Sequence, residues 1–254
     1  MSTLRIQHKA DCLVLDAWGA GGEQSLDFAP KWLGFDGPCL ADVPKLDPII
    51  DVLQRSVPGT RVGRTDEIVN RLFSVTLGQK VTGKNSKAAA YRLARDWGES
   101  PPGPHPNLWL FPEPKRLAGV PYHHFHPLGI ERRRADLLRL IASRAGALNR
   151  ALGKAPDAAQ AHLRALPGIG PWTSAIVVGS ALGDPDAIPV GDAHLPNWVS
   201  WHFAGEPRGD DSRMLALLDP YRGYRGLIAR ALKLRGKPPP RYGPKSTGRD
   251  IRET

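Results

Sequence analysis

The feature that most constrains this fold is the segment LPGIGPW (Leu166–Trp172), which places a Gly-x-Gly turn between two helical patterns. Gly168 and Gly170 tolerate positive φ angles, and neither has a side chain that would block a ligand from the backbone. Ile169 is expected to pack between the two helices. Pro171 suits a first helical turn, and the start of that helix presents N–H groups and a positive dipole end to an anion. The segment therefore predicts an anion-binding helical hairpin; the alternative is an ordinary tight turn.

Composition indicates which anion to expect. The chain has 254 residues, is 41% hydrophobic and carries a formal net charge of +10. A globular protein with this excess of positive charge is expected to bind a polyanion, most simply nucleic acid, although a basic protein without such a partner remains an alternative. No signal-peptide pattern or membrane-length apolar stretch is found, so we expect a cytoplasmic, nucleoid-associated protein without a membrane partner.

Hydrophobic periodicity divides the chain into three parts. Residues 1–64 contain the β-prone runs TLRIQH and CLVLDAW, with turns and short strands expected up to residue 40. Residues 65–235 follow the helical period, with Ser86 expected to cap one helix, and the Pro-rich stretch 98–114 predicts two lobes. Residues 236–254 are basic, lack an apolar period and predict a disordered tail. The expected fold class is mainly α, with a small N-terminal α/β region rich in β structure.

Five spaced segments, in order, resemble the helix–hairpin–helix (HhH-GPD) DNA glycosylases, in particular the bacterial 3-methyladenine DNA glycosylase II branch. They are RLFSVTLGQKVTGKNSKAAAYRLARDWG, FPEPKRLAG with HPLGIERRRADLLRLIA, LPGIGPWTSA, IPVGDAHLPNW and DPYRGYRGLIARAL. The resemblance covers about residues 66–234. It implies a two-lobed helical glycosylase body and an enzyme of base excision repair.

The resemblance implies that Asp192, which lies 22 residues after Gly170, is the catalytic residue. Breaking a base–sugar bond develops positive charge on the deoxyribose, and a fixed carboxylate stabilises that charge and can orient the attacking water. The start of the following helix is expected to keep Asp192 ionised. Local sequence alone favours a helix N-cap, the commonest role of Asp in such a place. The hairpin, the spacing and the GDAHL context favour the catalytic role instead, and one carboxylate can serve both.

The resemblance also implies that Trp172 forms the aromatic wall of a base pocket, with Ile176 one turn later. An indole face attracts the cationic ring of an N3- or N7-methylated purine that has been flipped out of the duplex. Core packing is the alternative role for Trp172. Related enzymes that also cut the backbone carry a nucleophilic Lys at the position of Trp172, so we expect a monofunctional hydrolase that leaves an abasic site. Ile176 stands where an aromatic residue is expected, which leaves the preferred base open.

Further contacts are implied by the same resemblance. Contacts to DNA are expected from Gly168, Gly170, Thr173, Gln79 and Lys80, and support of the Asp192 loop from Arg222. In the alkylpurine branch an apolar residue follows the Gln and fills the gap left by the flipped nucleotide. Lys80 stands there in this chain; its stem can fill space and its head can bind phosphate, and Val81 is the alternative.

No cofactor is expected. Cys12 and Cys39 cannot supply the four thiolates of an iron–sulfur cluster, and His123, His124 and His126 lack acidic or Cys partners at metal-ligand spacing. A monovalent cation at the hairpin carbonyls, around Leu166 and Ile169, is implied by resemblance alone.

The expected partner is double-stranded DNA with damaged bases, bound by a monomer. Two alternatives remain from the sequence. One is a noncatalytic DNA-binding module that senses structure or damage, and the other is a glycosylase for another lesion, such as a deaminated base.

Overall fold

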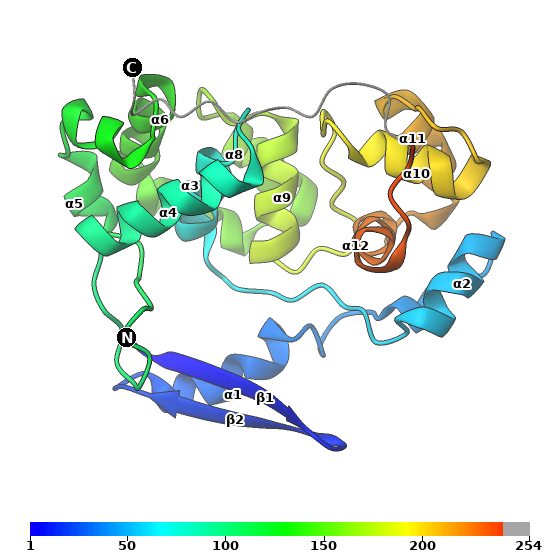
Figure 1. Ribbon diagram of the computed structural model, residues 1–254, viewed down its shortest axis with the longest axis horizontal. Helices are drawn as coiled ribbons and strands as arrows, with labels where there is room; N and C mark the ends of the chain where they lie inside the picture. Colours follow the sequence, from blue (N-terminus) through cyan, green and yellow to red (C-terminus); the bar gives the residue numbers. More distant parts are fainter. Residues whose placement is uncertain (241–254) are drawn as a thin grey trace. The chain divides into compact units, whose positions relative to one another are not determined.

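The computed structural model describes residues 1–240, and the chain forms two compact, mainly helical units (Figure 1). One unit contains Met1–Pro30 and Leu72–Ala147. The other contains Lys31–Arg71 and the described residues from Leu148 onward. Most of the predicted disordered tail, residues 241–254, lies outside the described residues. None of the helices within residues 1–240 has the length and apolar character that a membrane span requires.

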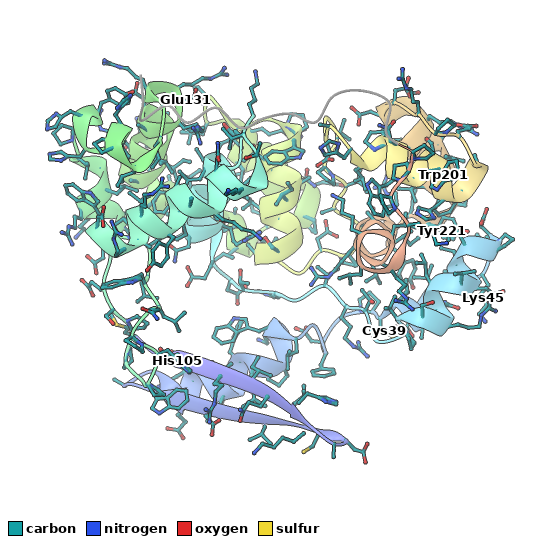
Figure 2. The ribbon with its side chains drawn as sticks, viewed as in Figure 1. Cys39, Lys45, His105, Glu131, Trp201 and Tyr221 are labelled. Atoms are coloured by element: carbon teal, nitrogen blue, oxygen red, sulfur yellow. The ribbon has the colours of Figure 1, made fainter. Side chains whose placement is uncertain are left out.

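The first unit begins with an antiparallel hairpin of strands β1 (Thr3–Lys9) and β2 (Cys12–Trp18). Both β-prone runs therefore form strands, as predicted. Arg5 and Asp16 face each other across the strands in an ion pair of 2.6 Å. The Pro-rich segment, which carries His105, passes beside the hairpin (Figure 2). The rings of Trp18 and His105 meet edge to face at 5.9 Å.

Two expectations for local structure need correction. Helix α1 (Gly22–Trp32) occupies a stretch where only strands and turns were expected. The helix forms because the last glycine of the turn, Gly22, is its first residue and an amphipathic run follows. Helix α4 (Gly83–Trp97) begins before Ser86, because Thr82 caps it by accepting the Asn85 N–H at 3.3 Å. The predicted fold class, mainly helical with a small β-containing N-terminal region, is confirmed.

The remaining elements of the first unit are short helices and turns. Helix α3 runs from the residues of the second unit into those of the first. The bounds are α3 (Ile68–Leu77), α5 (Pro114–Ala118), η2 (Tyr122–His124), η3 (His126–Leu128), α6 (Arg132–Ser143) and α7 (Ala145–Asn149).

A buried arginine fixes the end of α3 in the first unit. The side chain of Arg134 in α6 donates to the carbonyl oxygens of Leu77 at 3.1 Å and Gly129 at 3.3 Å, and the residue is only 4% exposed. Leu77 is the last residue of α3 and precedes the turn that holds Gln79 and Lys80. The guanidinium group therefore anchors the start of the predicted DNA-contacting turn.

Replacing Arg134 with Met is expected to lower the free energy of unfolding by about 3 kcal/mol, because two carbonyl groups lose a charged donor in a buried setting. Urea unfolding of the full chain measures this change. Arg133→Met, at an exposed position on the same helix, is the matched control and should shift stability by less than about 0.5 kcal/mol. Equal losses in the two variants would show that the buried hydrogen bonds do not stabilise the unit.

The regular elements described in the second unit are helices joined by loops, and an isolated antiparallel bridge links Cys39 to Arg61. The helices are η1 (Leu40–Asp42), α2 (Pro48–Ser56), η4 (Arg150–Gly153), α8 (Pro156–Arg164), α9 (Pro171–Ala181), α10 (Leu195–Ala204), α11 (Asp211–Leu218), η5 (Asp219–Tyr221) and α12 (Arg225–Arg235).

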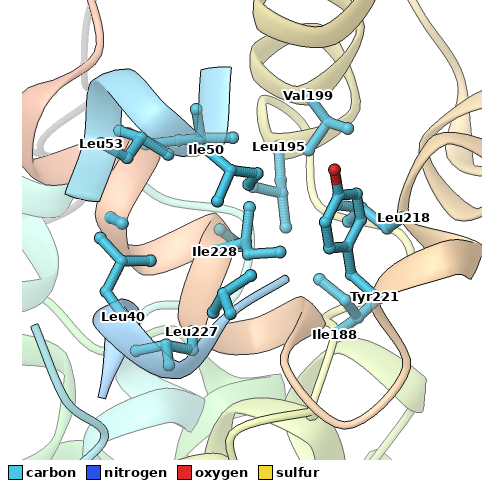
Figure 3. Packing of buried hydrophobic residues seen from close by; sticks show 14 of the residues in the cluster. Leu40, Ile50, Leu53, Ile188, Leu195, Val199, Leu218, Tyr221, Leu227 and Ile228 are labelled. Carbon is cyan, nitrogen blue, oxygen red and sulfur yellow. The ribbon is translucent and has the colours of Figure 1, made fainter. Parts of the chain in front are cut away.

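One hydrophobic cluster forms the core between α2, α10, α11 and α12 (Figure 3). Ile50 and Leu53 of α2 approach Ile228 of α12, and Leu195 begins α10 on the other side of this cluster. Ile188, which comes from the loop before Asp192, belongs to the same cluster. The core therefore fixes both the loop that leads to Asp192 and the helix that follows it.

Candidate active site

The predicted hairpin lies between α8 and α9. Ile169 is buried, as predicted, and its N–H donates to the carbonyl oxygen of Leu166 at 3.1 Å. Gly168 has φ of +94°, a conformation that favours glycine. Gly170 is the N-cap of α9 and makes no side-chain cap. Gly168 and Ile169 therefore match the prediction, whereas Gly170 does not adopt a positive φ.

Gly170 is not required by the fold. Its φ of −95° suits any residue, and a Cβ atom at this position would meet no heavy atom within 4 Å. The missing side chain leaves open space next to the positive end of the α9 dipole. An external anion can therefore approach the backbone at this point.

The carboxylate of Asp192 contacts both the start of α10 and Trp172. Its Oδ1 accepts the N–H groups of His194 at 2.9 Å and Leu195 at 2.8 Å, at the start of α10. Its Oδ2 accepts the indole N–H of Trp172 at 2.9 Å. The contact with the start of α10, whose N-cap residue is His194, and the contact with the predicted pocket wall therefore coexist in one half-buried carboxylate.

The surroundings of Asp192 favour its ionised form. Burial alone raises the pKa of this carboxyl group. The hydrogen bonds from Trp172, His194 and Leu195, together with the positive charge of Lys233, outweigh burial and hold the pKa below its ordinary value. Lys233 lies on α12, and no motif in the sequence singled it out. The resulting carboxylate is suited to stabilising a nearby positive charge.

Trp172 lies in the first turn of α9, with Ile176 one turn later, and both residues are half-buried. Because the N–H edge of the indole is bound to Asp192, the exposed part of the ring is what remains for stacking. The structure thus joins two of the predicted site residues, Trp172 and Asp192, through a direct hydrogen bond.

The arginine that holds the loop before Asp192 is Arg225, not the predicted Arg222. Arg222 pairs with Asp219 at 2.7 Å, and its side chain is 73% exposed. Arg225 instead binds Asp186 through its backbone N–H, its Nε and its Nη2. Both arginines belong to the PYRGYR segment, so the local pattern could not distinguish them. The contact of Arg225 with Asp186, 39 positions away, shows which arginine holds the loop.

The other predicted DNA-contacting residues lie in the turn after α3 and in the first turn of α9. Gln79 and Lys80 belong to the turn after α3 in the first unit, where Gln79 donates its N–H to the carbonyl oxygen of Thr76 at 3.1 Å. Lys80 is exposed and adopts a φ of +55°, which is uncommon for a residue with a side chain. Thr173 is 3% exposed, so its side chain faces the interior and does not form part of the hairpin surface.

The histidine cluster is engaged in ring contacts. His124 contacts the rings of Trp97 at 5.2 Å and His123 at 4.2 Å, and His126 contacts Tyr122 at 6.3 Å. Within residues 1–240, no group of three or more His, Cys, Asp or Glu side chains is arranged to hold a metal ion.

Comparisons of sequence and of structure place this chain beside DNA repair proteins. No protein-family model matches the chain. A Mycobacterium tuberculosis protein described as a probable bifunctional transcriptional activator/DNA repair enzyme AlkA is 30% identical over 165 residues. The match covers 64% of this chain and 33% of the relative, so the chain spans about a third of the length of that curated protein.

Two solved structures share the fold. A 3-methyladenine DNA-glycosylase from Archaeoglobus fulgidus matches with a TM-score of 0.77 and 17% identity, over 92% of this chain and 82% of that one. An 8-oxoguanine glycosylase/lyase from Clostridium acetobutylicum matches with a TM-score of 0.72 and 14% identity, over 91% and 81%. Together these matches show that the chain has the fold of these two glycosylases and is similar in sequence to a protein described as a DNA repair enzyme.

Proposed function

We propose that the protein is a monofunctional DNA glycosylase that removes alkylated purines from double-stranded DNA. The observation that carries this proposal is the hydrogen bond between Trp172 and Asp192, which places an ionised carboxylate at the edge of an aromatic ring. The mycobacterial relative, described as a DNA repair enzyme, supports it. An aromatic face suits a cationic base, and a carboxylate suits the cationic sugar that its departure creates.

The chemistry follows from the charges. An N3- or N7-alkylated purine already carries positive charge, so it leaves as a neutral base with the electrons of the glycosidic bond. The sugar becomes oxocarbenium-like, and the carboxylate of Asp192 stabilises that charge. Water then adds to the anomeric carbon and releases a proton to solvent. Because three hydrogen bonds already occupy Asp192, its main contribution is electrostatic, with the remaining lone pair available to orient the water.

DNA binding is assigned to the hairpin and the positive charge of the chain. Gly170 and the start of α9 would bind one phosphate. The main-chain carbonyls of Leu166 and Ile169 would hold a monovalent cation, which supplies further attraction for the phosphate. These oxygens suit such a cation, because the Leu166 carbonyl accepts the N–H of Ile169 and retains a second lone pair.

Gly170→Ala is expected to weaken DNA binding about tenfold, because a methyl group enters the space where the phosphate approaches the helix start. The stability of the protein should stay within about 0.5 kcal/mol of the wild type. Gly153→Ala is the matched control, because a Cβ at that position also meets nothing within 4 Å. Fluorescence anisotropy with a labelled duplex measures the affinity. Equal affinities in the two variants would exclude the hairpin from the interface.

The test of the activity is a panel of duplexes that each contain one lesion: 3-methyladenine, 7-methylguanine, hypoxanthine, uracil or 8-oxoguanine. We expect abasic sites, revealed by alkali, from the methylated purines. Release of only hypoxanthine or uracil would assign the protein to deaminated bases. No release from any duplex would favour the noncatalytic DNA-binding module.

Sodium borohydride trapping tests whether the protein is monofunctional. A lyase forms a Schiff base with the opened sugar through an amine, and Trp172 occupies the position where such enzymes carry Lys. We therefore expect no covalent protein–DNA product and no strand cleavage without alkali. A trapped product would place this protein with the glycosylase/lyases, one of which shares its fold.

A further inference from the structure

The side chain of Asp186 caps a helix that begins far away in the sequence. Its carboxylate accepts the N–H groups of Gly223 at 2.8 Å and Arg225 at 3.1 Å, at the start of α12. It also binds the guanidinium group of Arg225 through Nε at 2.9 Å and through Nη2. Both side chains of this ion pair are only about a quarter exposed, at 24% and 25%. We call Asp186, Arg225 and Gly226 the α12 clamp.

The backbones meet as closely as the side chains. The N–H of Leu227 donates to the carbonyl oxygen of Pro185 at 2.8 Å. A Cβ atom at Gly226 would lie 2.6 Å from the carbonyl oxygen of Ala187 and 3.0 Å from that of Pro185. Only glycine therefore permits this approach. We call this close contact between the start of α12 and residues 185–187 the joint.

The joint is connected to Asp192 over a short stretch of fixed chain. Ile188 is buried in the core cluster with Leu227 and Ile228 of α12. The N–H of Gly191 donates to Oδ2 of Asp211 at 3.0 Å, just before Asp192. The loop is thus held at the joint, in the core and at Gly191, so a displacement at Asp186 would move the carboxylate that follows.

We propose that the α12 clamp positions the carboxylate of Asp192 for catalysis, although neither Arg225 nor Asp186 contacts the substrate. The inference rests on the proposed function for its kinetic readout. Arg225 and Asp186 are positioning residues, because they act through the loop. The same helix carries Lys233, whose positive charge acts on Asp192. Helix α12 therefore positions both the Asp192 carboxylate, through the loop, and the Lys233 ammonium group.

The experiment compares Asp186→Asn, Arg225→Met and Arg225→Lys with the wild type. Two matched controls remove exposed ion pairs of the same unit: Asp219→Asn, from the pair with Arg222, and Arg213→Met, from the two-bond pair with Glu206. Single-turnover rates at saturating enzyme measure base release by folded molecules only. Binding to a duplex with an abasic-site analogue measures affinity. Carbon-13 NMR of labelled aspartate, with Asp192→Asn for assignment, measures the pKa of Asp192 without any substrate.

We expect Asp186→Asn and Arg225→Met to lower the single-turnover rate about tenfold, because small displacements of a catalytic group have effects of this size. DNA affinity should change less than about twofold. The pKa of Asp192 should rise, because its hydrogen bonds lose alignment. Arg225→Lys should recover part of the rate, and both controls should behave as the wild type.

The outcomes separate the two proposals. If the wild type releases bases and the clamp variants keep both its rate and its pKa for Asp192, the clamp has no positioning role. If the wild type releases nothing, the proposed function fails, and the NMR titration alone decides the clamp. An unchanged pKa of Asp192 in Asp186→Asn and Arg225→Met then overturns it, and a raised pKa supports it. Thermal unfolding identifies any variant that does not fold. If Asp186→Asn or Arg225→Met does not fold, the rate and the Asp192 pKa of Arg225→Lys test the clamp instead.

Discussion

Replacing Asp192 with Asn is expected to lower the rate of base release about 1,000-fold or more while DNA affinity is retained. The change removes the negative charge that stabilises the cationic sugar, an electrostatic contribution of this order. Asn keeps an oxygen acceptor for the N–H groups of His194 and Leu195, and it caps helices as well as Asp does. The Asn amide would face the indole N–H of Trp172 and cannot accept it, so the hydrogen bond to Trp172 is lost together with the charge, while the contacts at the start of α10 are kept. Single-turnover assays on a methylated duplex measure the loss of rate.

The chain offers a matched control for this substitution. Asp210 is the N-cap of α11 and accepts the N–H of Arg213 at 2.8 Å, much as Asp192 accepts N–H groups at the start of α10. Asp210→Asn should release bases at the wild-type rate, because it removes a cap carboxylate that has no tryptophan partner. If Asp192→Asn also reacts at the wild-type rate, helix capping is the whole role of Asp192 and the catalytic assignment is wrong.

The local parts of the site could be predicted from sequence because short-range geometry decides them. The two glycines around Ile169 define the hairpin, and Asp192 accepts N–H groups two and three residues later, at the start of α10. One carboxylate oxygen of Asp192 contacts the start of α10 and the other contacts Trp172, so the two contacts do not exclude each other.

The long-range parts could not be predicted because equivalent residue types compete for one partner. Arg222 and Arg225 lie three residues apart, and the choice between them depends on the position of Asp186, which only the folded loop sets. Helix starts show the same limit on a smaller scale. Thr82 and Ser86 are both good caps, and the structure uses the earlier one.

Replacing Trp172 with Phe is expected to lower the rate of base release about 10- to 100-fold, since a hydrogen bond to a charged group is worth about 1.5–3 kcal/mol. Phe keeps an aromatic ring for stacking but has no N–H for Oδ2 of Asp192. Burial still disfavours the charged carboxylate, and one of the hydrogen bonds that stabilise the charge is gone. The pKa of Asp192 therefore rises. In the wild type the charge of Asp192 is lost only as the pH falls through a lowered pKa. In the variant that loss begins at higher pH.

The pH dependence of the single-turnover rate separates the two roles of Trp172. If the indole N–H positions and ionises Asp192, the acid limb of the Trp172→Phe profile moves to higher pH and the rate at neutral pH falls. If the ring serves only as a stacking surface, the rate changes with the base but the acid limb stays in place. Trp201→Phe, on α10 (Figure 2), is the control for the loss of an indole and should leave both quantities unchanged. A wild-type rate and profile in Trp172→Phe would contradict the proposed role of this hydrogen bond, and the electrostatic account of Asp192 would then rest on the helix start and Lys233 alone.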